Sequence, residues 1–265
     1  MKIKLILLIM LLATAQLVAQ NKLKPVFTNP DFRGKLYLDH LGNLYTVEGN
    51  NVISKYDQNL NKLYSVTEKL QGELTLMDVS NPFRIYLYFE DQNVVLINDN
   101  EMKNIGRFDL ASKGFRFVPV ICRASNNGLW LYDEQEQKLK RLDNTLRKTI
   151  ESNNLFFYTD EDVNPNYMVE DEDFLYLNNP QQGIMIFDLF GKYYKTIAVP
   201  NLDFFQVLEN KILYIRNNSA YVYDLQTLEE NPLNLPLNIP DPKQVLAGNK
   251  RYYILSRDGL SVYSY

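Results

Sequence analysis

The sequence is poor in the side chains that build disulfides, metal sites and nucleophilic catalytic groups. It has one cysteine, one histidine and one tryptophan among 265 residues. The single Cys122 cannot form an intramolecular disulfide, and its place in the apolar run FVPVIC predicts a buried thiol. The single His40 has no second histidine or cysteine to complete a zinc site, so we interpret it as a surface residue of the turn segment DHLGN.

Long apolar runs are also missing, except at the N-terminus. Residues 1–19 carry Lys2 and Lys4, then an apolar run, and then small residues including Ala15 and Ala19. This order predicts a secretory signal peptide, with cleavage after Ala19 preferred over cleavage after Ala15. The apolar core is shorter than the roughly 20 residues that span a bilayer, and no later segment approaches that length, so we expect no transmembrane segment.

A surplus of basic residues is missing as well. The formal net charge is −4, and it becomes −6 when Lys2 and Lys4 leave with the predicted leader, which holds no acid. Binding to nucleic acid depends on Lys and Arg that neutralise phosphates, so a mildly acidic exported protein is a poor candidate for it.

What the sequence does have is a repeat with a period of about 40 residues. An aromatic residue recurs inside a short apolar run at intervals of 41, 44, 46, 38 and 39 residues, at Tyr45, Tyr86, Trp130, Tyr176, Tyr214 and Tyr253. A second apolar run follows each aromatic, and in five copies it ends in Asp or Asn, at Asp57, Asn98, Asp143, Asp188 and Asp224. We interpret these five residues as turn formers that bond to their own backbone, in preference to a ring of metal-binding carboxylates.

Each copy has room for four short strands, which is typical of one blade of a β-propeller. The sequence therefore predicts an all-β fold over residues 20–265, a six-bladed β-propeller with four-stranded antiparallel blades. The sixth copy lacks an outer strand, and we assign Leu23 to Thr28 to that place, which would close the ring. The third inner strand is expected from Phe117 to Arg123, and Asn217-Asn218 is expected to form a two-residue hairpin turn.

This strand pattern and six-fold aromatic period resemble the superfamily of six-bladed β-propellers over nearly the whole mature chain. The chain has no Trp-Asp pair, unlike WD-repeat propellers. Its leader and its abundance of Asn and Tyr are similar to those of exported envelope proteins of Bacteroidetes-type bacteria.

Enzymatic members of the superfamily offer specific comparisons. The stretch SRDGLSVY from Ser256 lacks the spacing and the tryptophan of the boxes that sialidases share. Lactonase-like members hold a metal with Glu, Asn and Asp at the axial mouth. This chain has carboxylates at the ends of its inner strands, at Asp39, Asp78, Glu170 and Glu209, but these ends are expected at the opposite mouth. We therefore assign no catalytic residue, no metal ligand and no cofactor.

One insertion interrupts the short repeats. Residues 151–166, ESNNLFFYTDEDVNPN, lie between the third and fourth blades and join three aromatics to three acids. Two other loops of the same type, DFR and GFR, also place an aromatic beside a charge, and such compositions are common in protein interfaces. The candidate interface is Arg33, Phe115, Arg116, Phe157, Tyr158, Asp160, Glu161 and Asp162. In the alternative interpretation, Phe156 and Phe157 fold back as a small satellite core and the acids are a solvated flank.

These features favour an exported, non-catalytic propeller in the periplasm or on the outer membrane that binds envelope proteins. One alternative is a small-ligand or hydrolase/lactonase-like site at the axial mouth. Another is a purely structural envelope component.

Overall fold

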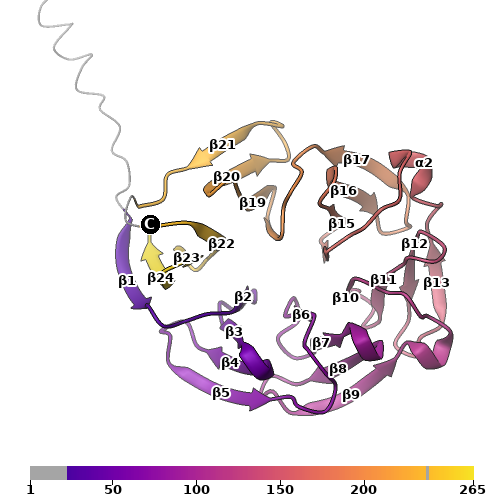
Figure 1. Cartoon of the computed structure of the whole chain (residues 1–265), viewed down its shortest axis with the longest axis horizontal. Coiled ribbons are helices and arrows are strands. Elements are labelled where there is room, and N and C mark those ends of the chain that lie inside the picture. Colours follow the sequence, from indigo (N-terminus) through magenta and orange to yellow (C-terminus); the bar gives the residue numbers. More distant parts are fainter. Residues whose placement is uncertain (1–22, 237–238) are drawn as a thin grey trace, which may run out of the picture.

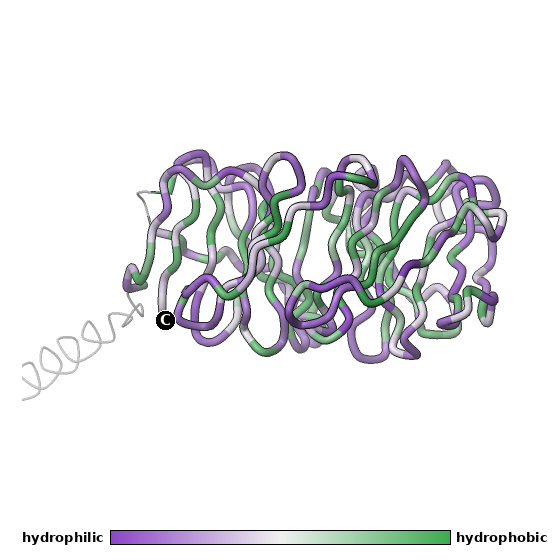
Figure 2. The backbone as a smooth tube through the Cα atoms, turned by 90° about the horizontal axis from the view of Figure 1, so that it is seen from below, coloured by the Kyte–Doolittle hydropathy of each residue, from purple (hydrophilic) through white to green (hydrophobic). Residues whose placement is uncertain are grey.

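The chain forms a ring of six antiparallel sheets, confirming the predicted propeller. A computed structural model describes residues 23–236 and 239–265, and in these residues it has six sheets of four strands each (Figure 1). The predicted signal peptide lies outside the described residues. Seen from the side, the ring is a disc with hydrophobic strands inside and hydrophilic connections above and below (Figure 2).

Strands follow one another from the axis to the rim in each blade. The inner strands are β2 (Lys35–Leu38), β6 (Leu76–Asp78), β10 (Ile121–Arg123), β14 (Tyr167–Asp171), β18 (Phe205–Leu208) and β22 (Pro242–Gly248). The second strands are β3 (Leu44–Glu48), β7 (Ile85–Phe89), β11 (Leu129–Asp133), β15 (Phe174–Asn179), β19 (Lys211–Arg216) and β23 (Arg251–Ser256).

The third strands are β4 (Val52–Tyr56), β8 (Val94–Asn98), β12 (Lys138–Leu142), β16 (Gly183–Asp188), β20 (Ser219–Asp224) and β24 (Gly259–Ser264). The outer strands are β5 (Lys62–Thr67), β9 (Asn104–Asp109), β13 (Lys148–Glu151), β17 (Tyr193–Ile197), β21 (Glu230–Leu233) and β1 (Lys24–Asn29). Four short helical segments complete the described structure: η1 (Gly49–Asn51), η2 (Glu90–Gln92), η3 (Ala111–Lys113) and α2 (Phe156–Thr159).

The ring closes through the N-terminal strand, as the sequence predicts. β1 pairs antiparallel with β24, from Lys24 opposite Ser264 to Asn29 opposite Leu260. Figure 1 shows β1 outside β24, next to the C-terminus. The sixth blade is thus completed by the other end of the chain, and β1 covers the edge of β24 that would otherwise be unpaired.

The repeated aromatics form the core. Trp130 and Tyr45 are fully buried, and all six periodic aromatics are at most 4% exposed. Burying a large side chain contributes about 2 kcal/mol, so the period of the sequence marks the main packing contacts. Cys122 is also fully buried, as predicted, and burial raises the pKa of its thiol.

The inner strands use side chains to satisfy backbone groups of their neighbours. Gln244 of the sixth blade donates from Nε2 to the Leu36 carbonyl, 2.8 Å away, and accepts from the Leu36 amide at 2.9 Å. Gln206 of the fifth blade bonds the Ala247 carbonyl and amide in the same manner, at 3.0 and 2.7 Å. These bonds matter because an inner strand has a free edge, and a buried unpaired amide or carbonyl is costly.

Aspartate-headed turns join third strands to outer strands. The carboxylate oxygen Oδ1 accepts from the backbone amide two residues on, at 2.8–2.9 Å, in the turns headed by Asp57, Asp99, Asp143, Asp188 and Asp224. In four of these turns it also accepts from the amide four residues on, at 2.9–3.0 Å. We call these five the aspartate turns; they confirm the turn interpretation for Asp57, Asp143, Asp188 and Asp224.

In one blade the predicted turn residue was wrong. Asn98 is the last residue of β8 and is buried, and its side-chain amide nitrogen donates to the Met102 carbonyl. Asp99, one position later, heads the turn because its carboxylate accepts from the amides of Glu101 and Lys103.

The other local predictions have mixed outcomes. Asn217 and Asn218 both have positive φ, 50° and 60°, and form the expected two-residue turn between β19 and β20. The third inner strand is shorter than predicted, since residues 117–120 are a loop and only Ile121–Arg123 pair with β11. Pro119 has no amide hydrogen to donate, which disfavours a longer strand.

The antiparallel order of the blades defines two faces of the disc. One face, the insertion face, carries the loops that lead from each outer strand to the next inner strand, and the turns between second and third strands. The opposite face, the mouth face, carries the turns between inner and second strands. Asp39 and His40 lie in one such turn on the mouth face, as predicted, and His40 is exposed.

Candidate functional site

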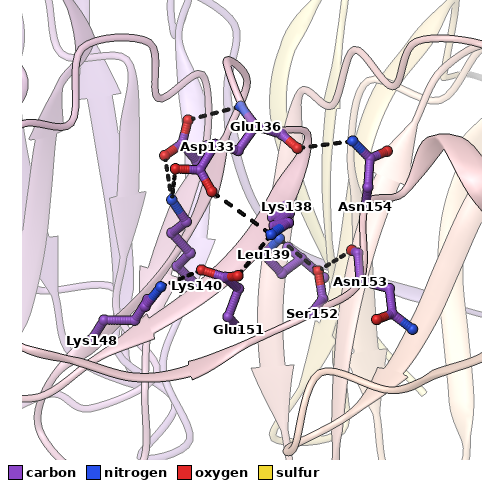
Figure 3. Close-up of polar contacts among 10 residues, drawn as sticks. All are labelled: Asp133, Glu136, Lys138, Leu139, Lys140, Lys148, Glu151, Ser152, Asn153 and Asn154. Carbon is purple, nitrogen blue, oxygen red and sulfur yellow. Dashed lines mark hydrogen bonds and ion pairs between the residues drawn. The ribbon is translucent and has the colours of Figure 1, made fainter.

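The insertion is fixed at its base to the turn between β11 and β12. Asn154 Nδ2 donates to the Glu136 carbonyl at 3.0 Å, and the Leu155 amide donates to the Gln137 carbonyl at 2.8 Å. Ser152 Oγ accepts from the Leu139 amide and donates to the Asn153 carbonyl, at 2.9 and 2.7 Å (Figure 3). The backbone of the insertion is therefore anchored on the third blade.

Ion pairs beneath this anchor join the same elements. Lys140 is buried, and its Nζ lies 2.7 Å from Asp133 Oδ2 and 2.8 Å from Glu136 Oε1 (Figure 3). Burial lowers the pKa of Lys140, but the hydrogen bonds to the two carboxylates outweigh it, and the pKa is raised. Glu151 accepts from Lys138 at 2.7 Å and from Lys148, and these bonds lower its pKa to about 2.

The far side of the insertion is fixed to the fourth blade and to the core. Leu155 and Val163 are at most 1% exposed and join the cluster between the third and fourth blades. The Tyr158 ring stacks on Tyr193, with centroids 4.5 Å apart, and Gln182 Nε2 donates to the Thr159 carbonyl at 3.2 Å. The interpretation that Phe156 and Phe157 fold back as a satellite core is wrong, because Leu155 and Val163 take that place.

Phe156 and Phe157 instead point outward from α2. They are 45% and 78% exposed. Asp160 and Glu161 follow them, are exposed, and make no side-chain ion pair with any residue the structure describes. A short helical turn thus presents two aromatic rings and two carboxylates to solvent from a rigid base.

A neighbouring loop adds to this surface. The Glu134 amide donates to the Phe117 carbonyl at 3.0 Å, so the turn between β11 and β12 lies between the loop of Phe117 and the insertion. Phe117 is 57% exposed and Arg116 is exposed. We call the set Arg116, Phe117, Phe156, Phe157, Asp160 and Glu161 the aromatic platform.

The structure does not assemble the whole predicted interface. Arg33 lies in the loop between β1 and β2, at the junction of the sixth and first blades, and its guanidinium bonds the Pro30 and Phe32 carbonyls. Figure 1 shows these two strands on the far side of the ring from α2. Phe115 is half-buried, with Lys140 Nζ 5.6 Å from its ring centroid. Tyr158 is held by its stacking on Tyr193, and Asp162 accepts from Gln137 Nε2 at 2.5 Å.

The platform therefore keeps Arg116, Phe157, Asp160 and Glu161 and gains two residues. Phe117 was assigned to a strand, although Pro119 two positions later was a signal against it. Phe156 was counted among the three aromatics of the insertion but was left out of the candidate interface. No sequence signal separates Leu155, which is buried, from its exposed neighbours Phe156 and Phe157.

A second hollow lies on the axis. An axial cavity of about 390 Å³ is lined by the inner strands, including the four predicted carboxylates Asp39, Asp78, Glu170 and Glu209. These carboxylates lie toward the mouth face, as the sequence predicted. His40 also lines this cavity, and its Nδ1 lies 3.3 Å from the Ser80 carbonyl.

Three of the axial carboxylates are engaged by the protein itself. Glu170 accepts from the Ser125 amide at 2.7 Å and from Trp130 Nε1 at 2.6 Å. Asp78 accepts from the Arg123 and Ser80 amides, at 2.7 and 2.8 Å. Asp39 accepts from Asn43 and from the Tyr45 hydroxyl.

Neither a metal cluster nor a membrane-spanning helix was found in the described part of the chain. Across residues 23–236 and 239–265, no three His, Cys, Asp or Glu side chains are grouped so that they could hold an ion. In the same residues, no helix has the length and apolar character needed to cross a bilayer.

Comparison with known proteins supports the fold. No protein-family model and no curated protein sequence matches the chain. The structure is similar to a streptogramin B lyase, with a TM-score of 0.59 and 16% identity over 86% of this chain and 78% of that one. The chain is a six-bladed β-propeller.

Two further similar structures come from other settings. One is BamB from Moraxella catarrhalis, with a TM-score of 0.53 and 11% identity over 88% of this chain and 82% of that one. The other is the extracellular domain of a putative hybrid two-component system from B. thetaiotaomicron, with a TM-score of 0.55 and 14% identity over 86% of this chain and 33% of that one. At these identities the likeness shows the propeller fold alone.

Proposed function

We propose that this propeller is an exported, non-catalytic module that binds a protein of the cell envelope through its aromatic platform. The observation that carries the proposal is the pair Phe156 and Phe157, exposed on a helical turn that is anchored to two blades. Exposed aromatic rings on a rigid base lose little conformational entropy on binding, and such groups dominate many interfaces.

The platform also suggests the chemistry of the partner. Asp160 and Glu161 flank the two rings and have no ion-pair partner among the described residues. A partner that offers an apolar surface with Lys or Arg at its edge would bury the rings and neutralise the carboxylates.

A hydrolytic site at the axial mouth has less support. Asp39, Asp78 and Glu170 each accept two or more hydrogen bonds from protein groups, so they serve the blades that they join. A purely structural role would not require exposed rings on an anchored turn.

Crosslinking in intact cells of the source organism, followed by affinity capture, tests the proposal. The double variant Phe156→Ser/Phe157→Ser is compared with the control Phe83→Ser, which removes a ring that is 59% exposed on the mouth face. We expect a captured partner to be lost in the double variant and kept in the control, with unchanged thermal unfolding in both. Equal capture by all three proteins, or equal loss in both variants, would contradict the platform as the binding surface.

The export part of the proposal has its own test. Sequencing the N-terminus of the protein isolated from the source cells should find a chain that begins at Gln20, or at Gln16 if cleavage follows Ala15. An intact chain beginning at Met1 in the cytoplasm would contradict export.

A further inference from the structure

One of the periodic aromatics differs from its counterparts in the other blades. Tyr176 is only 4% exposed, yet its hydroxyl makes no hydrogen bond with any described residue. A buried hydroxyl without a partner is costly, so a purely structural role does not account for it. In four other blades the protein itself bonds the polar atom of this residue: Tyr45 bonds Asp39, Tyr86 the Asn127 and Gly128 carbonyls, Trp130 Glu170, and Tyr214 Glu230.

The surroundings of Tyr176 also differ from those of Tyr253, the periodic aromatic of the sixth blade. The Tyr253 hydroxyl lacks a partner as well, but it is enclosed in the core. Tyr176 instead lines a cavity of about 170 Å³, together with Asp171 and Glu172. Burial and these two carboxylates raise the pKa of Tyr176 to about 12, so the hydroxyl keeps its proton and can donate it to a ligand.

This cavity lies between the fourth and fifth blades. The fourth blade contributes Asp171 and Glu172 and residues of β15, β16 and β17, and the fifth contributes residues of two of its turns. Those turns join β18 to β19 and β20 to β21, so the antiparallel order puts the cavity on the mouth face. Pockets for drug-sized ligands have roughly 300–1,000 Å³, so this smaller one suits a ligand of a single ring.

The fourth blade gives the cavity an apolar and partly aromatic wall. Phe174 and Tyr194 lie side by side, with ring centroids 5.7 Å apart and planes tilted by 37°. Ile186 is buried behind them, whereas Tyr194 is 63% exposed. Tyr194 therefore offers ring surface to a ligand that enters the cavity.

Polar side chains that the protein does not use complete the lining. Asp171, Glu209 and Gln226 line the cavity, and their side chains make no hydrogen bond or ion pair with any described residue. Asp171 is half-buried, and burial raises the pKa of its carboxyl. A hydroxyl group both donates and accepts, so a ligand with several hydroxyls could donate to Asp171 and accept from Tyr176. Such bonds would offset the desolvation of both groups.

Lys195 disfavours a charged ligand. Its Nζ lies 5.7 Å from the centroid of the Tyr194 ring, so an ammonium group of the chain itself already occupies the cation-binding position there. A cationic ligand would be repelled by Lys195, and an anionic one by the carboxylates of Asp171 and Glu172. An uncharged ligand avoids both repulsions.

We propose that the cavity between the fourth and fifth blades binds one ring of a neutral saccharide. Tyr176 donates to one hydroxyl of the sugar, Asp171 accepts from another, and the apolar C–H face of the sugar lies on Tyr194. The site is independent of the aromatic platform, which lies on the other face of the disc.

Calorimetric titration of the protein with glucose, galactose, mannose, fucose and N-acetylglucosamine tests the proposal. Choline serves as a cationic ligand of similar size, and glucuronate as an anionic sugar. We expect at least one of the neutral sugars to bind, and choline and glucuronate to bind at least about tenfold more weakly than that sugar.

Tyr176→Phe is the decisive variant because it removes the hydroxyl and nothing else. We expect it to weaken sugar binding by about tenfold and to leave thermal unfolding unchanged, since the hydroxyl has no partner in the protein. The control is Tyr86→Phe, at the same place in the repeat of the second blade. It should bind the sugar as the parent does and unfold at a lower temperature, because the Tyr86 hydroxyl bonds two carbonyls.

A second pair of variants tests the aromatic wall. Tyr194→Ala should weaken sugar binding several-fold. Phe190→Ala removes a ring of the same blade that is 79% exposed and does not line the cavity, so it should leave binding unchanged.

Three results would overturn the proposal. These are no heat with any of the neutral sugars at tens of millimolar, tighter binding of choline than of every sugar, and a Tyr176→Phe protein that binds sugar as the parent does. If Tyr176→Phe fails to fold, the contrast between Tyr194→Ala and Phe190→Ala decides the matter, and equal binding by these two would overturn the site.

Discussion

The aspartate turns and the insertion are both connections between strands, but they are held in different ways. Each aspartate turn is closed by bonds that span four residues or fewer, from one carboxylate to amides just ahead of it. The insertion is held by bonds to residues 12 or more positions away, on both sides of it in the sequence. An aspartate turn depends only on its own residues, so it can recur from blade to blade. The insertion depends on distant partners, so it can occur at one place in the ring and present side chains to solvent there.

Both kinds of connection present apolar side chains to solvent. In the aspartate turns, the residue with positive φ, from 60° to 79°, is Leu60, Met102, Leu146, Gly191 or Leu228. Met102 of this set is buried, but Leu228 is 57% exposed, and Phe190 in the turn headed by Asp188 is 79% exposed. In the insertion, Leu155 and Val163 face inward, while Phe156 and Phe157 face outward.

The largest effect is expected from the inward side of the insertion. Leu155 is fully buried between the third and fourth blades, so Leu155→Ala should lower the free energy of unfolding by about 3 kcal/mol. Phe157→Ala, two positions later, should leave it unchanged. Urea unfolding of both variants measures the contrast, and equal losses would show that the structure assigns the two side chains to the wrong sides.

The next effect concerns the ion pairs below the insertion. Lys140→Met keeps the volume of the side chain, but Asp133 stays buried and loses its ion-pair partner. We therefore expect the free energy of unfolding to fall by about 3 kcal/mol. Lys103→Met is the control, because the Lys103 and Glu101 side chains are 73% and 44% exposed and their pair should contribute nothing measurable. A Lys140→Met protein as stable as the parent would mean that the network in Figure 3 does not support the insertion.

Sequence reasoning succeeded where bonds are local or where the period repeats. The aspartate turns follow from a carboxylate and the amides after it, and the closing strand follows from a sixth copy that lacks one element. Asn98 and Asp99 are both common turn formers, so the sequence alone does not show which of them heads the turn. The strand register decides it, because Asn98 still pairs with Asn104 in the ladder between β8 and β9.

The candidate site was harder to predict because its contacts are distant. The grouping of Arg33 with the insertion rested on loop type alone, and the order of the blades places the two on opposite sides of the ring. The exposure of Phe156 depends on the turn between β11 and β12, whose carbonyls bond Asn154 and Leu155. No local pattern in the sequence predicts that contact.

A smaller effect is expected when an aspartate turn is disrupted. Asp188→Ala removes two bonds to backbone amides, at 2.9 Å each, and should cost about 1 kcal/mol. Asp188→Asn keeps an acceptor oxygen and should lie within a few tenths of a kcal/mol of the parent. The comparison is made by thermal unfolding, and a loss in Asp188→Ala as large as that in Leu155→Ala would remove the distinction between the two kinds of connection.

A further effect depends on pH. The pKa of Glu151 falls from 4.5 to about 2 because Lys138 and Lys148 donate to it. A lowered pKa in the folded state stabilises the fold above the ordinary pKa, and this contribution is lost as the pH falls. The stability difference between the parent and Glu151→Gln should therefore be full near neutral pH, shrink below 4.5 and nearly vanish at about 2. Unfolding with urea over this range measures it, and a difference that grows toward low pH would contradict the ion pairs.

The central claim is that the insertion face, and not the mouth face, meets a protein partner. The most direct measurement places the photocrosslinking amino acid benzoylphenylalanine at position 157 or at position 83 of the protein and irradiates cells of the source organism. We expect a discrete crosslinked species from position 157, absent from position 83 and lost when Asp160 and Glu161 are replaced by Lys. Crosslinks from position 83 alone, or from neither position, would contradict the claim.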